Sequence, residues 1–230
     1  PPNLRHPEGF WFGLSKRGRI IAYNKKRGLP ENVTDYEDLA DQSLKGQVCM
    51  RSSSNIYNLS LMAALIEANG TEEAESWANG VVSNFARDPQ GNDTAQLRAV
   101  SSGECGITVA NTYYIGRLMG SGKADDQKTI DGLGFLFPNQ EGRGAHVNIS
   151  GGGVAKYAPN KENAIRFLEY LTEESSQRMF SEGNNEYPVV GKVSGPVASL
   201  GAFKEDSVNA SLFGERQREA VMVYDRAGWR

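Results

Sequence analysis

The amino-acid sequence predicts an α/β protein. Short apolar runs, typical of buried strands, alternate along the chain with segments of helical periodicity, and turn residues separate them. No internal repeat interrupts this alternation. The 230 residues are 39% hydrophobic and 23% charged, which is ordinary for a globular protein and too apolar for a long disordered chain. A chain of this size buries enough surface for one large core or two small ones.

The predicted strands are short and bounded by glycine, proline or polar residues. The first contains the run GRIIAYN, in which aliphatic residues follow a glycine and end at an asparagine. The glycines at 151–153 predict a flexible or tightly turned segment. The expected strands cover residues 18–24, 47–50, 107–110, 133–137, 145–149 and 189–190.

The predicted helices carry start and stop signals as well as periodicity. Thr34 is followed three residues later by Glu37, which is the spacing of a capping box. Asn160 precedes a segment in which Ile165 and Leu168 recur at helical spacing. The expected helices cover residues 34–46, 57–69, 71–86, 94–102, 161–174, 177–181 and 214–229.

The charge balance and the hydropathy pattern exclude several classes of partner. With 25 basic and 28 acidic residues the chain has no broad attraction for nucleic acid, and we expect no nucleic-acid partner. No apolar run approaches the roughly 20 residues that cross a bilayer, so we expect a chain that does not itself span a membrane. The chain opens on PPNLRHPEGFWFG without an initiator methionine, and we expect that a front segment precedes it.

Several catalytic motifs are absent or broken. The run at 117–123 resembles a P-loop, but Arg117 stands where the motif needs glycine and Ala124 follows the lysine, so a polar turn is favoured. The only two histidines, His6 and His146, argue against a histidine-based triad or a multi-histidine metal site. No GxSxG sequence occurs.

The two cysteines, Cys49 and Cys105, each lie close to a predicted strand. Their number and spacing fit one disulfide in an oxidising compartment and two reduced core thiols equally well. The lack of a CxxC pair argues against a structural zinc site.

Tyrosines give the strongest indication of a binding site. Tyr113 and Tyr114 directly follow the predicted strand 107–110, and ligands of α/β sheets bind beyond the carboxyl ends of strands. Arg117 lies one helical turn further on, where a cation favours the anionic phenolate. A phenolate is a hard ligand suited to a highly charged metal ion. Alternatively, one ring packs in the core and the other covers the surface.

Tyr57 adds a third phenol at the start of a predicted helix, after the polar loop RSSSN. A helix N-terminus also stabilises an anion. The alternative is an aromatic ring that packs on a neighbouring element.

The order of these motifs resembles one family along the whole chain, namely the periplasmic ferric-iron-binding proteins of bacterial ABC importers, and most closely the cyanobacterial type. The combination of SSNIYN, GEC and NTYYxGRL in this order is more specific than any single motif. The resembling stretches are WFGLSKRGRIIAYNK (11–25), YEDLADQSLKGQVCMRSSSNIYNLSL (36–61), DTAQLRAVSSGECGITVANTYYIGRL (93–118) and HVNISGGGVAKYAPNKENAIRFLEYL (146–171).

The resemblance implies a type II solute-binding fold, with two α/β lobes and a ligand cleft between them. Residues 1–19 and 144–194 would form part of the N-terminal lobe, and residues 20–143 and 195–230 the C-terminal lobe. Relatives have a further N-terminal stretch that contributes a histidine and another tyrosine to iron. We therefore expect an incomplete first lobe and exposed apolar surface beside it, and His6 does not match the relatives' histidine.

The resemblance also implies roles for particular residues. Its metal ligands are Tyr57, Tyr113 and Tyr114, matched motif by motif. Two matching arginines would lower the phenol pKa values and balance charge around the ligands. They are Arg17 and Arg117. The cysteines Cys49 and Cys105 match a disulfide-bonded pair.

The function implied is capture of Fe(III) in the periplasm and delivery to an ABC permease in the inner membrane, by a monomer without enzymatic activity. Three alternatives stay open. The first is a protein of the same fold that binds a polyamine, sugar or oxyanion. The second is an enzyme with Tyr114 as acid or base. The third is a fragment that binds nothing.

Overall fold

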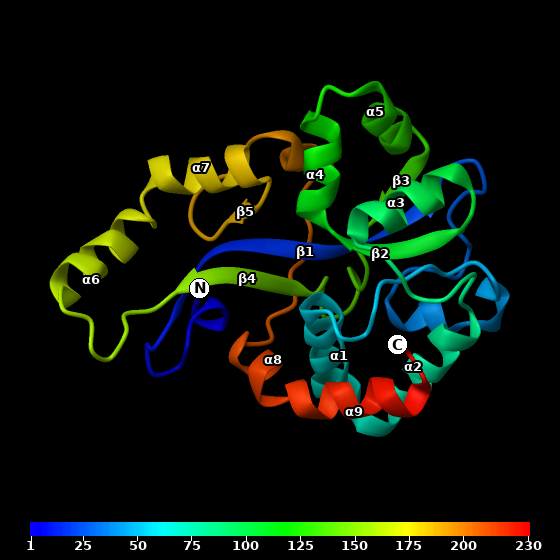
Figure 1. Cartoon of the computed structure of the whole chain (residues 1–230), viewed down its shortest axis with the longest axis horizontal. Helices are drawn as coiled ribbons and strands as arrows, with labels where there is room; N and C mark the ends of the chain where they lie inside the picture. Colours follow the sequence, from blue (N-terminus) through cyan, green and yellow to red (C-terminus); the bar gives the residue numbers. More distant parts are fainter.

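A single long strand organises the protein. The computed structural model describes residues 1–230, and its strand β1 (Phe12–Asn24) is the centre of a five-stranded antiparallel sheet. The first half of β1 pairs with β4 (Val147–Gly152) and β5 (Tyr187–Pro188), and the second half pairs with β2 (Ile107–Asn111) and β3 (Leu133–Leu136). Figure 1 shows β1 running from the side of the molecule that carries α6 and α7 to the side that carries α3 and β2.

Nine α-helices surround this strand. They are α1 (Ile56–Asn69), α2 (Thr71–Ser83), α3 (Asp93–Ser102), α4 (Thr112–Gly120), α5 (Ala124–Asp131), α6 (Lys161–Tyr170), α7 (Glu174–Asn184), α8 (Ser211–Glu215) and α9 (Gln217–Ala227). Short 3-10 helices occur at Pro2–Leu4, Glu37–Ala40, Gln42–Leu44 and Pro196–Leu200.

Two apolar clusters cover opposite faces of the β1–β2–β3 part of the sheet. Ile21 belongs to a cluster of 23 buried residues that α1, α2 and α9 complete. Its neighbour Ile20 belongs to a cluster of 11 buried residues, to which α3 and α4 contribute. Because successive side chains of a strand point to opposite faces, one apolar run supplies both cores. Figure 1 shows the two groups of helices on either side of β1.

The predicted helix at 34–46 is wrong. The segment forms two separate 3-10 helices, Glu37–Ala40 and Gln42–Leu44. Thr34 does not cap a helix, because its backbone amide and hydroxyl both donate to the Asp38 carboxylate, at 2.8 and 3.1 Å. The Glu37 carboxylate instead accepts a hydrogen bond from Arg143, 106 residues away. A long-range ion pair has therefore replaced the local capping interaction.

Other predicted boundaries move for reasons of packing. The glycines at 151–152 are part of β4, where a side chain on Gly151 would clash with the Phe12 carbonyl oxygen, so they allow close backbone approach. Helices α4, α5 and α8 were not predicted, and α7 is longer than the predicted 177–181. The strand expected at 189–190 is wrong, since the residues that pair with β1 are Tyr187–Pro188.

The part of the molecule around α6 and α7 exposes apolar side chains. Helix α6 is amphipathic but has no buried residue, and Phe167 on it is 59% exposed. A groove of about 1180 Å³ lies between α6 and the start of β1, and its apolar lining includes Phe10, Leu14 and Leu168. None of the helices combines the length and the apolar character that crossing a membrane requires.

Candidate metal centre

Three phenol side chains from two helices meet at one place. Tyr57 comes from the first turn of α1, and Tyr113 and Tyr114 come from the first turn of α4. The hydroxyl oxygens of Tyr57 and Tyr113 are 2.9 Å apart, and their rings meet edge to face. The rings of Tyr113 and Tyr114 stack with centroids 4.2 Å apart. The structure thus brings together all three tyrosines singled out in the sequence.

The start of α1 positions Tyr57. Asn55 is the N-cap residue, and its side-chain oxygen accepts a hydrogen bond of 3.0 Å from the Tyr57 amide. This contact begins the helix at Ile56, so that Tyr57 lies in its first turn. The next residue, Asn58, is fully buried and donates to the Arg51 and Ser52 carbonyl oxygens. The polar loop before Tyr57 is therefore anchored to the helix that follows it.

The start of α4 positions the other two phenols. Strand β2 runs directly into α4 at Asn111, so Tyr113 and Tyr114 follow the strand without a loop. Thr112 is buried, and its hydroxyl oxygen accepts a hydrogen bond of 3.2 Å from the Gly18 amide on β1. Tyr113 is buried, whereas Tyr114 is half-buried. The end of the strand predicted at 107–110 places the two rings at the sheet end, and α4, which is not among the expected helices, begins there.

The two predicted arginines both lie beside Tyr113. The guanidinium carbon of Arg117 is 4.8 Å from the Tyr113 ring centroid and 6.0 Å from that of Tyr114. The guanidinium carbon of Arg17 is 5.9 Å from the Tyr113 centroid. Arg17 is also paired with Glu186 at 2.9 Å, which neutralises its charge, whereas Arg117 is exposed.

A third arginine, Arg51, lies beside Tyr57 and was not predicted. Its guanidinium carbon is 5.2 Å from the Tyr57 centroid, and its Nη1 is 2.8 Å from the Asp93 carboxylate. Burial acts to lower the pKa of Arg51, but hydrogen bonding to Asp93 and the neighbouring Tyr114 phenol outweigh burial and raise it. The only signal in the sequence was its position as the first residue of the polar loop RSSSN, directly after the predicted strand 47–50.

The electrostatics of Tyr113 differ from the expectation. Burial, followed by hydrogen bonding to Tyr114 and Tyr57, raises the pKa of the Tyr113 phenol well above its usual value. The expected lowering by arginine is therefore outweighed, because desolvation and two neighbouring phenols both disfavour the anion. A cation that binds here has to displace the phenolic protons, so its binding releases protons.

Other metal-ligating side chains do not gather in the structure. No group of three or more His, Cys, Asp or Glu side chains could hold a metal ion. His146 is buried, with its Nε2 3.2 Å from the Ser60 hydroxyl oxygen, and the His6 ring lies tilted against Phe10, with ring centroids 4.7 Å apart. The phenol cluster is therefore the candidate site that the geometry supports.

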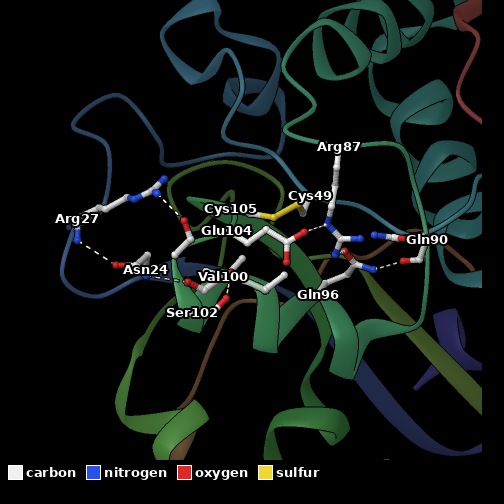
Figure 2. Close-up of a disulfide and its surroundings, with 12 residues drawn as sticks. Asn24, Arg27, Cys49, Arg87, Gln90, Gln96, Val100, Ser102, Glu104 and Cys105 are labelled. Atoms are coloured by element: carbon white, nitrogen blue, oxygen red, sulfur yellow. Dashed lines mark hydrogen bonds and ion pairs between the residues drawn. A yellow bond between two sulfur atoms is a disulfide. The ribbon is translucent and has the colours of Figure 1, made fainter.

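The two cysteines form a disulfide, which decides between the alternatives left open by their spacing. Cys49 and Cys105 are bonded with Cα atoms 5.9 Å apart, and both side chains are buried (Figure 2). The bond ties the segment before α1 to the loop before β2, where the Cys49 amide also donates to the Ile107 carbonyl. Both tyrosine-bearing helices begin within a few residues of these tethered segments.

Comparison with known proteins gives consistent matches along the chain. Residues 2–204 match the family of bacterial extracellular solute-binding proteins. The chain is 50% identical over 232 residues to Iron uptake protein A1 of Synechocystis sp., with 100% of this chain and 64% of that protein covered. It therefore spans about two thirds of the length of this curated relative.

Two solved structures also match this chain along its whole length. A Trichodesmium protein in complex with iron and citrate superposes with a TM-score of 0.97 at 55% identity, covering 100% of this chain and 73% of that one. The ferric binding protein from Campylobacter jejuni superposes with a TM-score of 0.93 at 40% identity, covering 100% and 74% respectively.

Proposed function

Because this chain belongs to the family of bacterial extracellular solute-binding proteins, we propose that it captures ferric iron as cargo through the phenolates of Tyr57, Tyr113 and Tyr114. The predicted α/β solute-binding fold is confirmed by the match to solved structures. The observation that carries the proposal is the meeting of the three phenols, with the Tyr57 and Tyr113 hydroxyl oxygens 2.9 Å apart. Of the three relatives named above, one is an iron uptake protein, one is in complex with iron and citrate, and one is a ferric binding protein.

The chemistry of the site suits this cargo. Fe(III) is a hard, highly charged cation, and phenolate oxygens are hard anionic ligands. Three phenolates offset its charge, and Arg117 lies close enough to Tyr113 to balance the ligands' charge in turn, whereas the charge of Arg17 is already paired with Glu186. Because each phenol must lose its proton to bind, the affinity for iron is expected to fall in acid.

The division into lobes that we propose follows the two halves of β1. Residues 1–19 and 144–194 form part of one lobe, and residues 20–143 and 195–230 form the other, with the iron site in a cleft between them. Two observations support this division. The first half of β1 pairs with β4 and β5, and the second half with β2 and β3. Helix α9, near the end of the chain, packs on α1 and α2.

The setting we propose is the periplasm, where a monomer delivers iron to an ABC permease of the inner membrane. The Cys49–Cys105 disulfide supports an oxidising compartment. The matching family consists of solute-binding proteins, and one relative is an iron uptake protein. We propose that this chain likewise binds and carries its solute without catalysing a reaction.

The experiment that tests this proposal is a titration with ferric citrate followed by visible absorbance. We expect a tyrosinate-to-iron charge-transfer band that saturates near one equivalent, since one cluster is present. The double variant Tyr113→Phe/Tyr114→Phe keeps the rings and removes two ligand oxygens, so it should lose the band. The matched control Tyr157→Phe/Tyr170→Phe changes two exposed phenols and should keep it.

Two outcomes overturn the proposal. One is the absence of the band in the unsubstituted protein. The other is a double variant that retains both the band and the affinity for iron. A colourless complex with a polyamine, sugar or oxyanion in the same titration cell would point to the alternative cargo.

A further inference from the structure

A buried ion cluster of Arg19, Arg51 and Asp93 lies next to the phenols, since Arg51 contacts both Asp93 and the Tyr57 ring. We infer that Arg51, held by the buried carboxylate of Asp93, supplies the positive charge that balances the phenolate ligands and positions the Tyr57 ring. Arg51 is thus a positioning and charge-balancing residue, and Asp93 acts through it. This inference rests on the proposed function.

Asp93 is the centre of the cluster. It is the first residue of α3 and is fully buried, at a helix N-terminus where a carboxylate is favoured. Its Oδ1 accepts from Arg51 Nη1 at 2.8 Å. Its Oδ2 accepts from Arg19 Nη1 at 3.1 Å and from the Asn111 amide at 2.8 Å. One carboxylate therefore contacts β1, the loop before α1 and the end of β2.

These contacts reach every segment that carries a phenol. Asn111 is the residue before α4, and its amide is held by Asp93. Asn58 follows Tyr57 in α1, and its side-chain oxygen accepts from Arg19 at 2.8 Å. The backbone of Arg51 is fixed as well, because its carbonyl oxygen accepts from Asn58 and from the Trp229 indole at 3.0 and 3.1 Å.

The charge of the cluster is unbalanced. Arg19 and Arg51 both pair with the single carboxylate of Asp93, so an excess of positive charge lies beside the phenols. Buried charges without a full complement of partners are costly, and anionic ligands nearby relieve that cost. A phenolate anion at the cluster would supply the counter-charge that this arrangement lacks.

Arg51 differs in this respect from the other two arginines. Arg17 is already neutralised by Glu186. Arg117 is exposed, so solvent and salt screen its charge. The Arg51 side chain is only 13% exposed, and its guanidinium carbon is 5.2 Å from the Tyr57 centroid. Of the three arginines that lie beside the phenol rings, Arg51 therefore combines low exposure to solvent with an incomplete counter-charge.

The test compares Arg51→Gln and Arg51→Lys with the unsubstituted protein by competition between the protein and citrate for ferric iron. We expect Arg51→Gln to weaken iron binding about tenfold or more and to shift the wavelength of the charge-transfer band, because the phenolates lose a nearby cation. Arg51→Lys should restore most of the affinity, because it keeps the charge. Arg87→Gln is the matched control, since Arg87 is similarly buried and pairs with Glu104 at 2.9 Å.

Asp93→Asn tests the second link, with the same loss expected because Arg51 is no longer held. If Asp93→Asn fails to fold, the Arg51 variants decide the question alone. Arg51→Gln with the same affinity and band as Arg87→Gln overturns the inference, and so does a variant that only loses stability. A missing band in the unsubstituted protein is a different result, since it overturns the proposed function instead.

Discussion

Removal of the Cys49–Cys105 disulfide should lower the free energy of unfolding of this protein by several kilocalories per mole. The perturbation is the double variant Cys49→Ala/Cys105→Ala, which removes the covalent bond and keeps small apolar side chains in a fully buried place. The bond joins residues separated by 56 positions, and that closed loop contains α1, α2 and α3. The unfolded chain with the bond intact is therefore strongly restricted.

The magnitude follows from the length of the loop. In the chain-entropy treatment, closing a loop of this size removes unfolded-state entropy worth about 4 kcal/mol at 25 °C. For a protein of 150–250 residues, such a loss lowers the melting temperature by about 8–16 °C. Removal of the two buried sulfur atoms also leaves a small cavity, which lowers the unfolding free energy further.

Urea unfolding followed by tryptophan fluorescence measures this change, because Trp77 and Trp229 lie in the larger of the two cores. A reductant should shift the unfolding curve of the unsubstituted protein toward that of the variant and leave the variant unchanged. A difference in unfolding free energy below about 1 kcal/mol would refute the loop-closure reasoning. A reductant effect on the variant itself would show that the treatment acts elsewhere.

Two further predictions concern buried side chains. Burial, and to a smaller extent the charges of Arg19 and Arg143, lowers the pKa of His146 from 6.5 to about 3. Between pH 3 and pH 6.5 the unfolded state therefore binds more protons than the folded state. The unfolding free energy should therefore fall as the pH drops below about 6.5, by about 2 kcal/mol at pH 5, and His146→Gln should lose this component in urea titrations at several pH values. Trp229 is 1% exposed and packs on aromatic rings that include Tyr224, so Trp229→Ala should cost about 3–5 kcal/mol. A melt that changes by less than 1 °C would contradict the packing described for that residue.

The elements that local signals specify were predicted well. Helix α1 begins one residue before the predicted 57–69 and ends where predicted, because the cap at Asn55, the apolar residues and Gly70 are all close in sequence. The end of β2 was predicted for the same reason, and it places Tyr113 and Tyr114 together at the sheet end. The disulfide was predicted only through the resemblance to a known family.

Apart from what the resemblance implied, interactions between distant residues were not predicted. The capping box at 34–37 was a sound local pattern, but the Glu37 carboxylate pairs with Arg143 instead. Arg51 and Asp93 are 42 residues apart, and neither stands in a motif that indicates the other. The first half of β1 was missed because it contains Lys16 and Arg17, whose partners Glu205 and Glu186 come from far along the chain.

The sequence by itself determined the α/β class, most helices and the identity of the candidate phenols, because periodicity, caps and strand ends are properties of neighbouring residues. Only the tertiary structure decided that Tyr57 meets Tyr113, and that one buried carboxylate holds two arginines behind them. The physical reason is that these contacts depend on how β1 brings β2 and α1 together, and the desolvation that gives them their strength exists only once the chain has packed.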